Sequence, residues 1–313
     1  MSNGKIIVVM GGTSTEAEIS RQTGTAILKA LQSKGYNAEG MELHPQTFAS
    51  EIAAAHPAIV FNALHGKFGE DGLIQGTLDM LGIPYTGSGV LAAAITMDKA
   101  ASKRVFIAEG ISTPKAHSYY RFENEQRNLA AEIEQEFGLP VVVKASSQGS
   151  SIGVYIVEQP ADLASALDEA FKYDNEIIVE QFIRGKELTV AVWGDEKQQE
   201  AFPIIEITTT SGRYDYESKY TKGASTHIIP ARVSEAKTKE IQELAVKTFR
   251  ACGCRGVARV DMMLAEDGTP YVIEVNSVPG MTELSLVPDA GRAMGVEFPD
   301  LCARLLEMAG YQK

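Results

Sequence analysis

Acidic and amide side chains occupy facing positions in a hairpin that the sequence predicts. Residues 259–264 and 271–276 alternate apolar and polar side chains and flank an Asp-Gly turn, which is typical of a β-hairpin. A loop of two or four residues gives the same register, which places Asp261 opposite Glu274. Asn276 shares their face, because side chains two positions apart point to the same side of a strand. Directly opposed like charges destabilise a sheet, so this pair requires a cation.

The hairpin alone leaves two interpretations open for that cation. Oxygen ligands from two carboxylates and an amide suit Mg²⁺, whose remaining positions are usually filled by water and substrate phosphates. In the alternative, Arg259 on the same face neutralises both acids, and the face is simply solvated. The opposite face is predicted to be core and consists of Val260, Met262, Leu264, Tyr271, Ile273 and Val275.

Three lysines lie in segments that could bind phosphate. Lys144 precedes a loop of mostly small residues, 145–153, and such loops let backbone N–H groups converge on an anion. Lys99 lies on a predicted helix, and Lys219 lies in a long polar segment, 208–227. Taken singly, these features are an ordinary Ser/Gly turn and two solvated lysines. They form a triphosphate site only if the fold brings them together.

The elements that must position these groups change in type along the chain. Apolar runs at 6–10 and 59–61 alternate with helical periodicity, for example at 73–81, which indicates a parallel α/β unit of roughly 95 residues. A single helix is predicted from about residue 90 to 109, where Gly110 ends it. Beyond it the sequence predicts a small α+β unit and then, from about residue 187, mostly strands.

Composition and charge exclude several functional classes. The 313 residues carry 29 Lys and Arg against 41 Asp and Glu, a net charge of −12, so a broad basic face for nucleic acid is not expected. No apolar run approaches the ~20 residues that span a bilayer, no secretory cleavage pattern is found, and the P-loop pattern is absent. Cys252, Cys254 and Cys302 are too few for a disulfide framework and are predicted to be buried or half-buried structural thiols. We expect a reduced, cytoplasmic protein that binds neither nucleic acid nor membrane.

Ten different short motifs are distributed along nearly the whole chain. They occupy residues 11–16, 63–66, 69–72, 84–88, 97–99, 149–153, 214–220, 259–261, 274–276 and 279–282. Each motif is weak alone, but the ordered set closely resembles the D-alanine–D-alanine ligase family of ATP-grasp enzymes. Ala145 departs from the commonest pattern of that family, in which proline is frequent, but this change removes no ligand.

The resemblance implies a mixed α/β and α+β architecture. A parallel α/β N-terminal domain, residues 1–96, would precede a two-part ATP-grasp fold with mostly antiparallel sheets. Its central subdomain would span 97–184 and its C-terminal catalytic domain 185–313, with ATP between them. Segment 208–227 would close as a lid that shields a reactive acyl phosphate from water. The family also suggests a homodimer.

The resemblance further implies how the amino-acid substrates are bound. Glu16 would take the ammonium of the first D-alanine and would be linked by hydrogen bonds to Ser150 and Tyr220. His65 would lie near the same substrate, and Ser285 would bind the carboxylate of the second. Arg259 and the backbone of Gly280 would stabilise the oxyanion.

For the nucleotide, the resemblance implies contacts to phosphates, adenine and ribose. Asp261, Glu274 and Asn276 would hold two Mg²⁺ (or Mn²⁺) ions. Glu180 and the backbone after it would read adenine, Glu187 would meet the ribose, and Lys219 would approach the γ-phosphate. The residues implied to contact ATP are Lys99, Lys144, Ser151, Glu180, Gln181, Ile183, Glu187, Lys219 and Asn276.

The implied activity is the ATP-dependent ligation of two D-alanine molecules through a D-alanyl phosphate, for peptidoglycan precursors. The Lys219-Tyr220 pair is similar to that of relatives that form the dipeptide. One alternative is an ATP-grasp ligase that uses D-lactate or D-serine as its second substrate. The other is a non-catalytic nucleotide-binding protein on the same fold.

Overall fold

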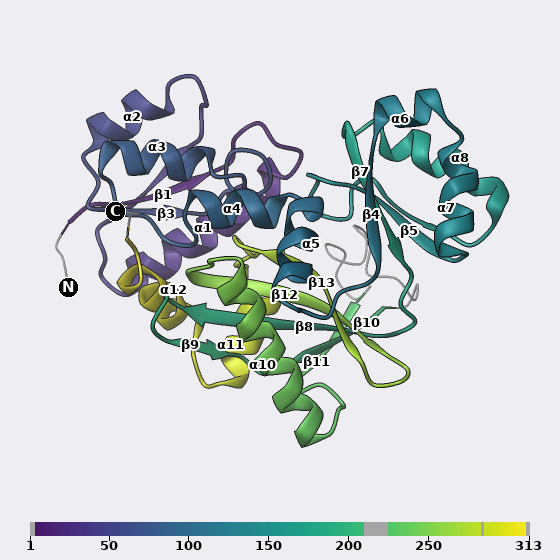
Figure 1. Cartoon of the computed structure of the whole chain (residues 1–313). Coiled ribbons are helices and arrows are strands. Elements are labelled where there is room, and N and C mark those ends of the chain that lie inside the picture. The colour runs from purple at the N-terminus through teal and green to yellow at the C-terminus, as the bar shows by residue number, and fades with distance from the viewer. Residues whose placement is uncertain (1–3, 210–224, 283–284, 311–313) are drawn as a thin grey trace.

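A computed structural model describes residues 4–209, 225–282 and 285–310, in which three β-sheets follow one another (Figure 1). The N-terminal elements are β1 (Ile6–Met10), α1 (Ala17–Ser33), β2 (Ala38–Glu42), α2 (Phe48–Ala55), β3 (Ile59–Asn62), α3 (Leu73–Leu81), α4 (Val90–Met97) and α5 (Lys99–Ala108). The central elements are β4 (Ala116–Tyr120), α6 (Arg121–Gln126), α7 (Leu129–Phe137), β5 (Val141–Ala145), β6 (Val154–Val157), α8 (Pro160–Ala170) and β7 (Glu176–Gln181). The last are β8 (Gly185–Gly194), β9 (Gln199–Ala201), β10 (Ile205–Thr209), β11 (Ser225–Ile228), α10 (Glu235–Ala251), β12 (Gly256–Ala265), β13 (Pro270–Asn276), α11 (Leu286–Ala293) and α12 (Phe298–Glu307).

The first sheet is parallel, with strand order β2-β1-β3. Its central strand is buried on both faces, as the continuous apolar run predicts. Ile6 and Val8 face one hydrophobic cluster, whereas Ile7 and Val9 face another. The parallel α/β prediction for this part of the chain is therefore confirmed.

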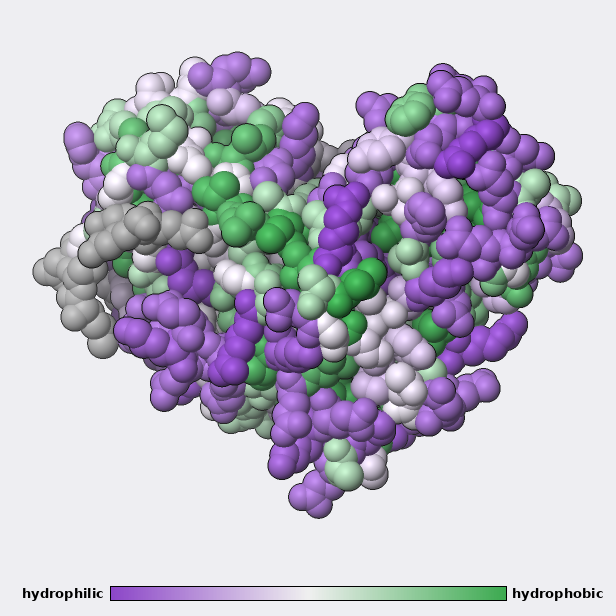
Figure 2. Space-filling view, in the orientation of Figure 1, coloured by the Kyte–Doolittle hydropathy of each residue, from purple (hydrophilic) through white to green (hydrophobic). Residues whose placement is uncertain are grey.

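The other two sheets are antiparallel, which confirms the predicted mixed architecture. The central sheet has strand order β4-β7-β5-β6, and α7 and α8 pack on it around their own cluster of apolar side chains. It forms a lobe whose face in the view of Figure 2 is mostly hydrophilic. The last sheet has strand order β11-β10-β8-β12-β13, with β9 paired to β8.

The N-terminal and C-terminal sheets share one hydrophobic core. The cluster that includes Ile6 of β1 also contains Trp193 of β8 and Leu301 of α12. On the other face of the C-terminal sheet, Phe249 of α10 packs with Phe106 of α5. Helices α4 and α5 thus lie at the centre of the molecule, between the three sheets (Figure 1). The sheets fall within the three predicted ranges, and the boundaries themselves stay a prediction.

The single helix predicted over 90–109 is wrong, because the chain breaks it at Asp98. Asp98 has an extended backbone and its carboxylate accepts a hydrogen bond from the N–H of Ala101, so it caps a new helix, α5. Lys99 is therefore the first residue of α5. The backbone N–H of Lys99 donates to the carbonyl of Ser146 at 2.9 Å, which ties α5 to the end of β5.

The hairpin of β12 and β13 follows the predicted register only next to the polar residues. Asp261 pairs with Glu274, but the register shifts by one residue beyond Asp261 because of a β-bulge. As a result Val272 is fully buried, whereas Tyr271 and Ile273 are half-buried. The prediction that Tyr271 and Ile273 are core residues is therefore wrong, and the bulge is the reason.

Both described ends of segment 208–227, which the sequence predicts to be a loop, belong to strands. Thr208 and Thr209 end β10 and pair with Thr226 and Ser225 of β11, so the described ends of this segment are a strand ladder. Residues 210–224 lie outside the described part. Cys252, Cys254 and Cys302 are buried as predicted. Within the described ranges, no helix is long and apolar enough to cross a membrane.

Candidate active site

The polar face of the β12–β13 hairpin is organised around Asp261. Arg259 donates two hydrogen bonds to its carboxylate, both 2.8 Å long, and Asn276 donates a third at 3.0 Å. Thr189 of β8 donates a fourth at 2.6 Å. Glu274 instead has the ammonium of Lys99 at 3.6 Å. Arg259 therefore forms its ion pair with Asp261, and Glu274 has a cation of its own.

The donor set of this face fits a hard divalent cation. The side chains of Asp261 and Glu274 are only 16% and 26% exposed, so both carboxylates are largely shielded from solvent. Carboxylate and amide oxygens are the ligands that Mg²⁺ prefers, and two carboxylates with substrate phosphates are a usual set. Within the described ranges, no three His, Cys, Asp or Glu side chains form a metal site by themselves. A metal here would therefore share its ligands with a bound substrate.

The segments that carry Lys99 and Lys144 are bonded to each other although they lie far apart in the sequence. The connection of α5 to the end of β5 brings them together, since Lys144 lies on β5. Lys99 donates to the carbonyl of Gln148 at 2.6 Å, within the small-residue loop. Lys144 is buried and donates to Glu180 on β7 at 2.7 Å. The two lysines and Glu180 thus form the basic end of the site.

Next to this basic end lies a cavity of about 200 Å³ that is lined by several predicted residues. Glu16 lies at its wall and accepts a hydrogen bond from the hydroxyl of Ser150. The Glu16 carboxylate packs so closely that a Cβ at Gly66 or Gly149 would lie 2.7 or 2.8 Å from its Oε2 atom. Predicted residues that line this cavity are Glu16, His65, Ser150, Arg259, Asn276, Gly280 and Ser285.

His65 and Glu70 line the same cavity in unusual electrostatic surroundings. Burial lowers the pKa of His65 to about 4, so its ring is neutral at pH 7, and it hydrogen-bonds Thr23 at 3.0 Å. Burial, together with the charge of nearby Glu16, raises the pKa of Glu70 to about 8. The sequence did not single out Glu70, although the residue lies in one of the motifs.

At the far wall of the cavity, Gly280 and Ser285 come into contact. Ser285 precedes α11, and its hydroxyl accepts a hydrogen bond from the N–H of Thr282 at 3.0 Å. A Cβ at Gly280 would lie 3.1 Å from that hydroxyl oxygen, so a larger residue would crowd it. The arrangement offers a hydroxyl and a helix N-terminus to an anionic group.

The remaining predicted residues lie around the basic end or outside the described part. Ile183 is buried and Gln181 is exposed, after Glu180. Glu187 lies on β8 two residues before Thr189, and therefore on the sheet face of Asp261. Ser151 has a positive φ of 60° in the small-residue loop. Lys219 and Tyr220 lie outside the described residues.

Sequence reasoning missed one buried cation at this site, Lys103. Its ammonium lies 3.2 Å from Glu180, and its side chain is only 4% exposed. Burial lowers the pKa of Lys103 to about 8, although the nearby carboxylate of Glu180 acts to raise it. Lys103 follows Lys99 by four residues and so lies on the same side of α5, a spacing that could have identified it.

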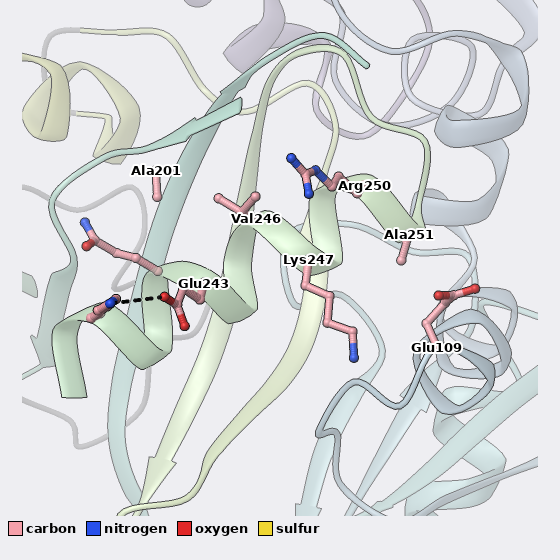
Figure 3. Close-up of a pocket in the computed structure, with 9 residues that line it drawn as sticks. Glu109, Ala201, Glu243, Val246, Lys247, Arg250 and Ala251 are labelled. Carbon is pink, nitrogen blue, oxygen red and sulfur yellow. Dashed lines mark ion pairs between the residues drawn. The ribbon is translucent and has the colours of Figure 1, made fainter. Parts of the chain in front are cut away.

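A separate open groove of about 720 Å³ follows the outer face of α10 (Figure 3). Four of its charged side chains have partners within the protein. Lys239 lies 3.8 Å from Glu243, Lys247 donates to the carbonyl of Gly110, and Arg250 donates to Gln199. None of the predicted site residues lines this groove.

Comparisons with known proteins agree with this geometry. The family models "D-ala D-ala ligase N-terminus" and "D-ala D-ala ligase C-terminus" match residues 36–88 and 106–307. Curated D-alanine–D-alanine ligases from Pelotomaculum thermopropionicum and Moorella thermoacetica are each 48% identical to the chain; the matches cover 97% of it and 96% and 99% of those proteins.

Solved structures give the same result. The D-alanine–D-alanine ligase of Bacillus anthracis, complexed with ATP, matches with a TM-score of 0.84 and 33% identity over 97% of each chain. The VanG D-Ala:D-Ser ligase of Enterococcus faecalis matches with a TM-score of 0.83 and 31% identity over 98% of this chain and 99% of that one. The chain therefore belongs to the D-alanine–D-alanine ligase family of ATP-grasp enzymes.

Proposed function

We propose that the chain joins two D-alanine molecules at the expense of ATP, through a D-alanyl phosphate, and so supplies D-alanyl-D-alanine for peptidoglycan precursors. The observation that carries this proposal is the continuity of the site. A cavity of amino-acid size, walled by Glu16, adjoins a basic end through Arg259 and Asn276. A substrate carboxylate in the cavity and a terminal phosphate at the basic end would therefore meet.

The first D-alanine would bind through Glu16. Its ammonium would pair with the Glu16 carboxylate, which Ser150 already orients. His65 is neutral, so it would not repel that ammonium. Tyr220 would complete the hydrogen bonds to Ser150, as the family resemblance implies.

The nucleotide would bind across the basic end. Lys99 and Lys144 would contact its phosphates, with Lys219 near the γ-phosphate. Glu180, Gln181 and Ile183 would surround adenine, Glu187 would contact the ribose, and Ser151 would cover the phosphates from the small-residue loop. Asp261, Glu274 and Asn276 would hold two Mg²⁺ or Mn²⁺ ions, which neutralise phosphate charge.

In the reaction, the carboxylate of the first D-alanine attacks the γ-phosphorus, and ADP leaves. The amine of the second D-alanine then attacks the carbonyl carbon of the acyl phosphate, phosphate leaves, and the peptide bond forms. Arg259 and the N–H of Gly280 would stabilise the oxyanion, and Ser285 would hold the second carboxylate. The protein contributes position and charge, as phosphoryl transfer generally requires.

A second candidate function differs from the first only in the second substrate of the ligase. The similarity to a D-Ala:D-Ser ligase, at 31% identity, favours D-serine as an alternative, whereas the curated D-alanine–D-alanine ligases are more similar, at up to 48% identity. D-lactate would occupy the same position. A homodimer and a cytoplasmic location stay predictions.

Release of ADP tests the proposal. With ATP, Mg²⁺ and D-alanine alone, we expect ADP, phosphate and the dipeptide in equal amounts. D-serine and D-lactate are then added in competition, and product analysis identifies the second substrate. If D-alanine alone releases no ADP but a mixture with D-serine does, the second candidate is correct. If no mixture releases ADP while ATP still binds, the chain is a non-catalytic nucleotide-binding protein.

A further inference from the structure

Lys103 is buried at the junction of two sheets. It lies on α5, close to Glu180 of β7 in the central sheet. Its ammonium also donates a hydrogen bond to the hydroxyl of Thr113, which in turn donates to the carbonyl of Val272 on β13 at 2.7 Å. Lys103 thus connects the central sheet with the C-terminal sheet.

Glu180 is shared between two lysines. Its Oε2 atom accepts from Lys144 at 2.7 Å, and its Oε1 atom lies 3.2 Å from Lys103. The side chain of Glu180 is only 2% exposed. Burial acts to raise the pKa of Glu180, but the charges of Lys144 and Lys103 outweigh it, so the net shift is downward and the group is a carboxylate.

The proposed nucleotide site requires Lys144 to change partners. A phosphate bound to Lys144 would compete with Glu180 for the charge of that ammonium. A buried carboxylate that loses its only cation is strongly destabilised. With Lys103 still in place, Glu180 remains compensated when Lys144 turns to the phosphate. Lys103 itself also donates to the hydroxyl of Thr113.

We propose that Lys103 is a positioning residue of the nucleotide site, which keeps Glu180 compensated so that Lys144 is free to bind phosphate. This inference rests on the proposed binding of ATP between the central and C-terminal sheets. In this proposal the two neighbouring cations have different roles. Lys144 binds the phosphate of the nucleotide, and Lys103 keeps the carboxylate of Glu180 paired.

Calorimetric titration of the full chain with ATP and with adenosine tests this role. The Lys103→Met variant removes the charge but keeps the length of the side chain. We expect its dissociation constant for ATP to rise by about 10- to 100-fold, because Lys144 stays with Glu180. The affinity for adenosine, which has no phosphates, and the KM for D-alanine should stay as in the wild type. A loss of structure alone would instead weaken the binding of ATP, adenosine and D-alanine together.

A double-mutant cycle with Glu180→Gln shows whether Lys103 affects the affinity for ATP through Glu180. In the Glu180→Gln background no carboxylate competes for Lys144, so Lys103→Met should change the affinity for ATP less than twofold. The matched control is Arg104→Met, which removes a cation from the same helix that pairs with Glu176 of the same strand, but at the surface. We expect no change in nucleotide affinity for it.

Two results would overturn the proposal. One is wild-type affinity for ATP in Lys103→Met, and the other is an equal loss of affinity in both backgrounds. If Lys103→Met does not fold, Lys103→Gln, which can still donate hydrogen bonds without the charge, carries the same expectations, and Lys103→Arg should recover affinity. If the wild type itself does not bind ATP, the proposed function fails instead, so the two failures are distinguishable.

Discussion

The two ends of the site differ in the partners of their charged side chains. At the cavity end, the described contacts that hold the acids are neutral donors: the hydroxyl of Ser150 on Glu16 and the N–H of Gly66 on Glu70. At the basic end, charges are already paired within the protein. Lys99 pairs with Glu274, and Lys144 pairs with Glu180.

This difference predicts two modes of binding. An ammonium that enters the cavity gains an ion pair with Glu16 and reduces the repulsion between Glu16 and Glu70. Little of the protein therefore has to rearrange. A nucleotide and its metal ions must instead exchange existing protein ion pairs for new ones. Binding at the basic end is therefore the step that moves side chains, and variants at the two ends should differ in which substrate they affect.

The largest effect is expected for Glu274→Gln. This change removes a proposed metal ligand and the partner of Lys99, so ADP release should fall by at least about 10²-fold. Circular dichroism and the melting temperature should change little, because Glu274 is half-buried on a polar face. Glu266→Gln, in the turn of the same hairpin, is the matched control. Turnover near that of the wild type in Glu274→Gln would contradict the metal role.

At the cavity end, Glu16→Gln should affect the amino acid and spare the nucleotide. Loss of the charge that pairs with the substrate ammonium should raise the KM for D-alanine about 10- to 100-fold. The dissociation constant for ATP, measured by calorimetry, should not change. Glu18→Gln, two residues further along α1 with a side chain 72% exposed, serves as control. A change in ATP affinity with an unchanged KM for D-alanine would reverse the assignment of the two ends.

The raised pKa of Glu70, which comes from burial and from the nearby charge of Glu16, should be visible in the stability of the protein without any ligand. The pKa of Glu70 is about 8 in the folded chain, above its usual value of 4.5, so the folded state loses stability as the pH rises through that interval. Glu70→Gln should therefore match the wild type below pH 4.5 and become more stable than it by about 1–3 kcal/mol near pH 9. Denaturant unfolding at pH 5, 7 and 9 measures this, with exposed Glu109→Gln as control. A stability difference that does not depend on pH would contradict the raised pKa of Glu70.

The smallest effect is expected for an ion pair outside both ends. Arg232 holds the pKa of Glu206 down to about 2, so this pair stabilises the fold above pH 4.5, and the contribution fades as the pH falls toward 2. Arg232→Gln should lower the melting temperature by about 1–3 °C at pH 7, since the guanidinium is largely exposed. Turnover should be unchanged. The difference in melting temperature between the wild type and Arg232→Gln should become smaller at pH 3. A difference that stays constant with pH would contradict a stabilising ion pair between Arg232 and Glu206.

Sequence reasoning recovered the parts of the site that depend on local pattern. The pairing of Asp261 with Glu274 followed from strand alternation and a turn signal. The bulge that exposes part of Ile273 was missed, since alternation carries no sign of one inserted residue. The break at Asp98 was missed because periodicity continues across it, although Asp is a common helix cap.

The sequence by itself determined the family motifs, the α/β start and the acidic face of the hairpin, because residue type and short-range spacing set these features. Only the tertiary structure decided which cation meets which acid. Lys99 reaches Glu274, and Lys103 reaches Glu180, across 175 and 77 positions of the chain. Such distances are closed by the packing of α5 between the sheets, and the local sequence does not show which carboxylate each lysine will meet.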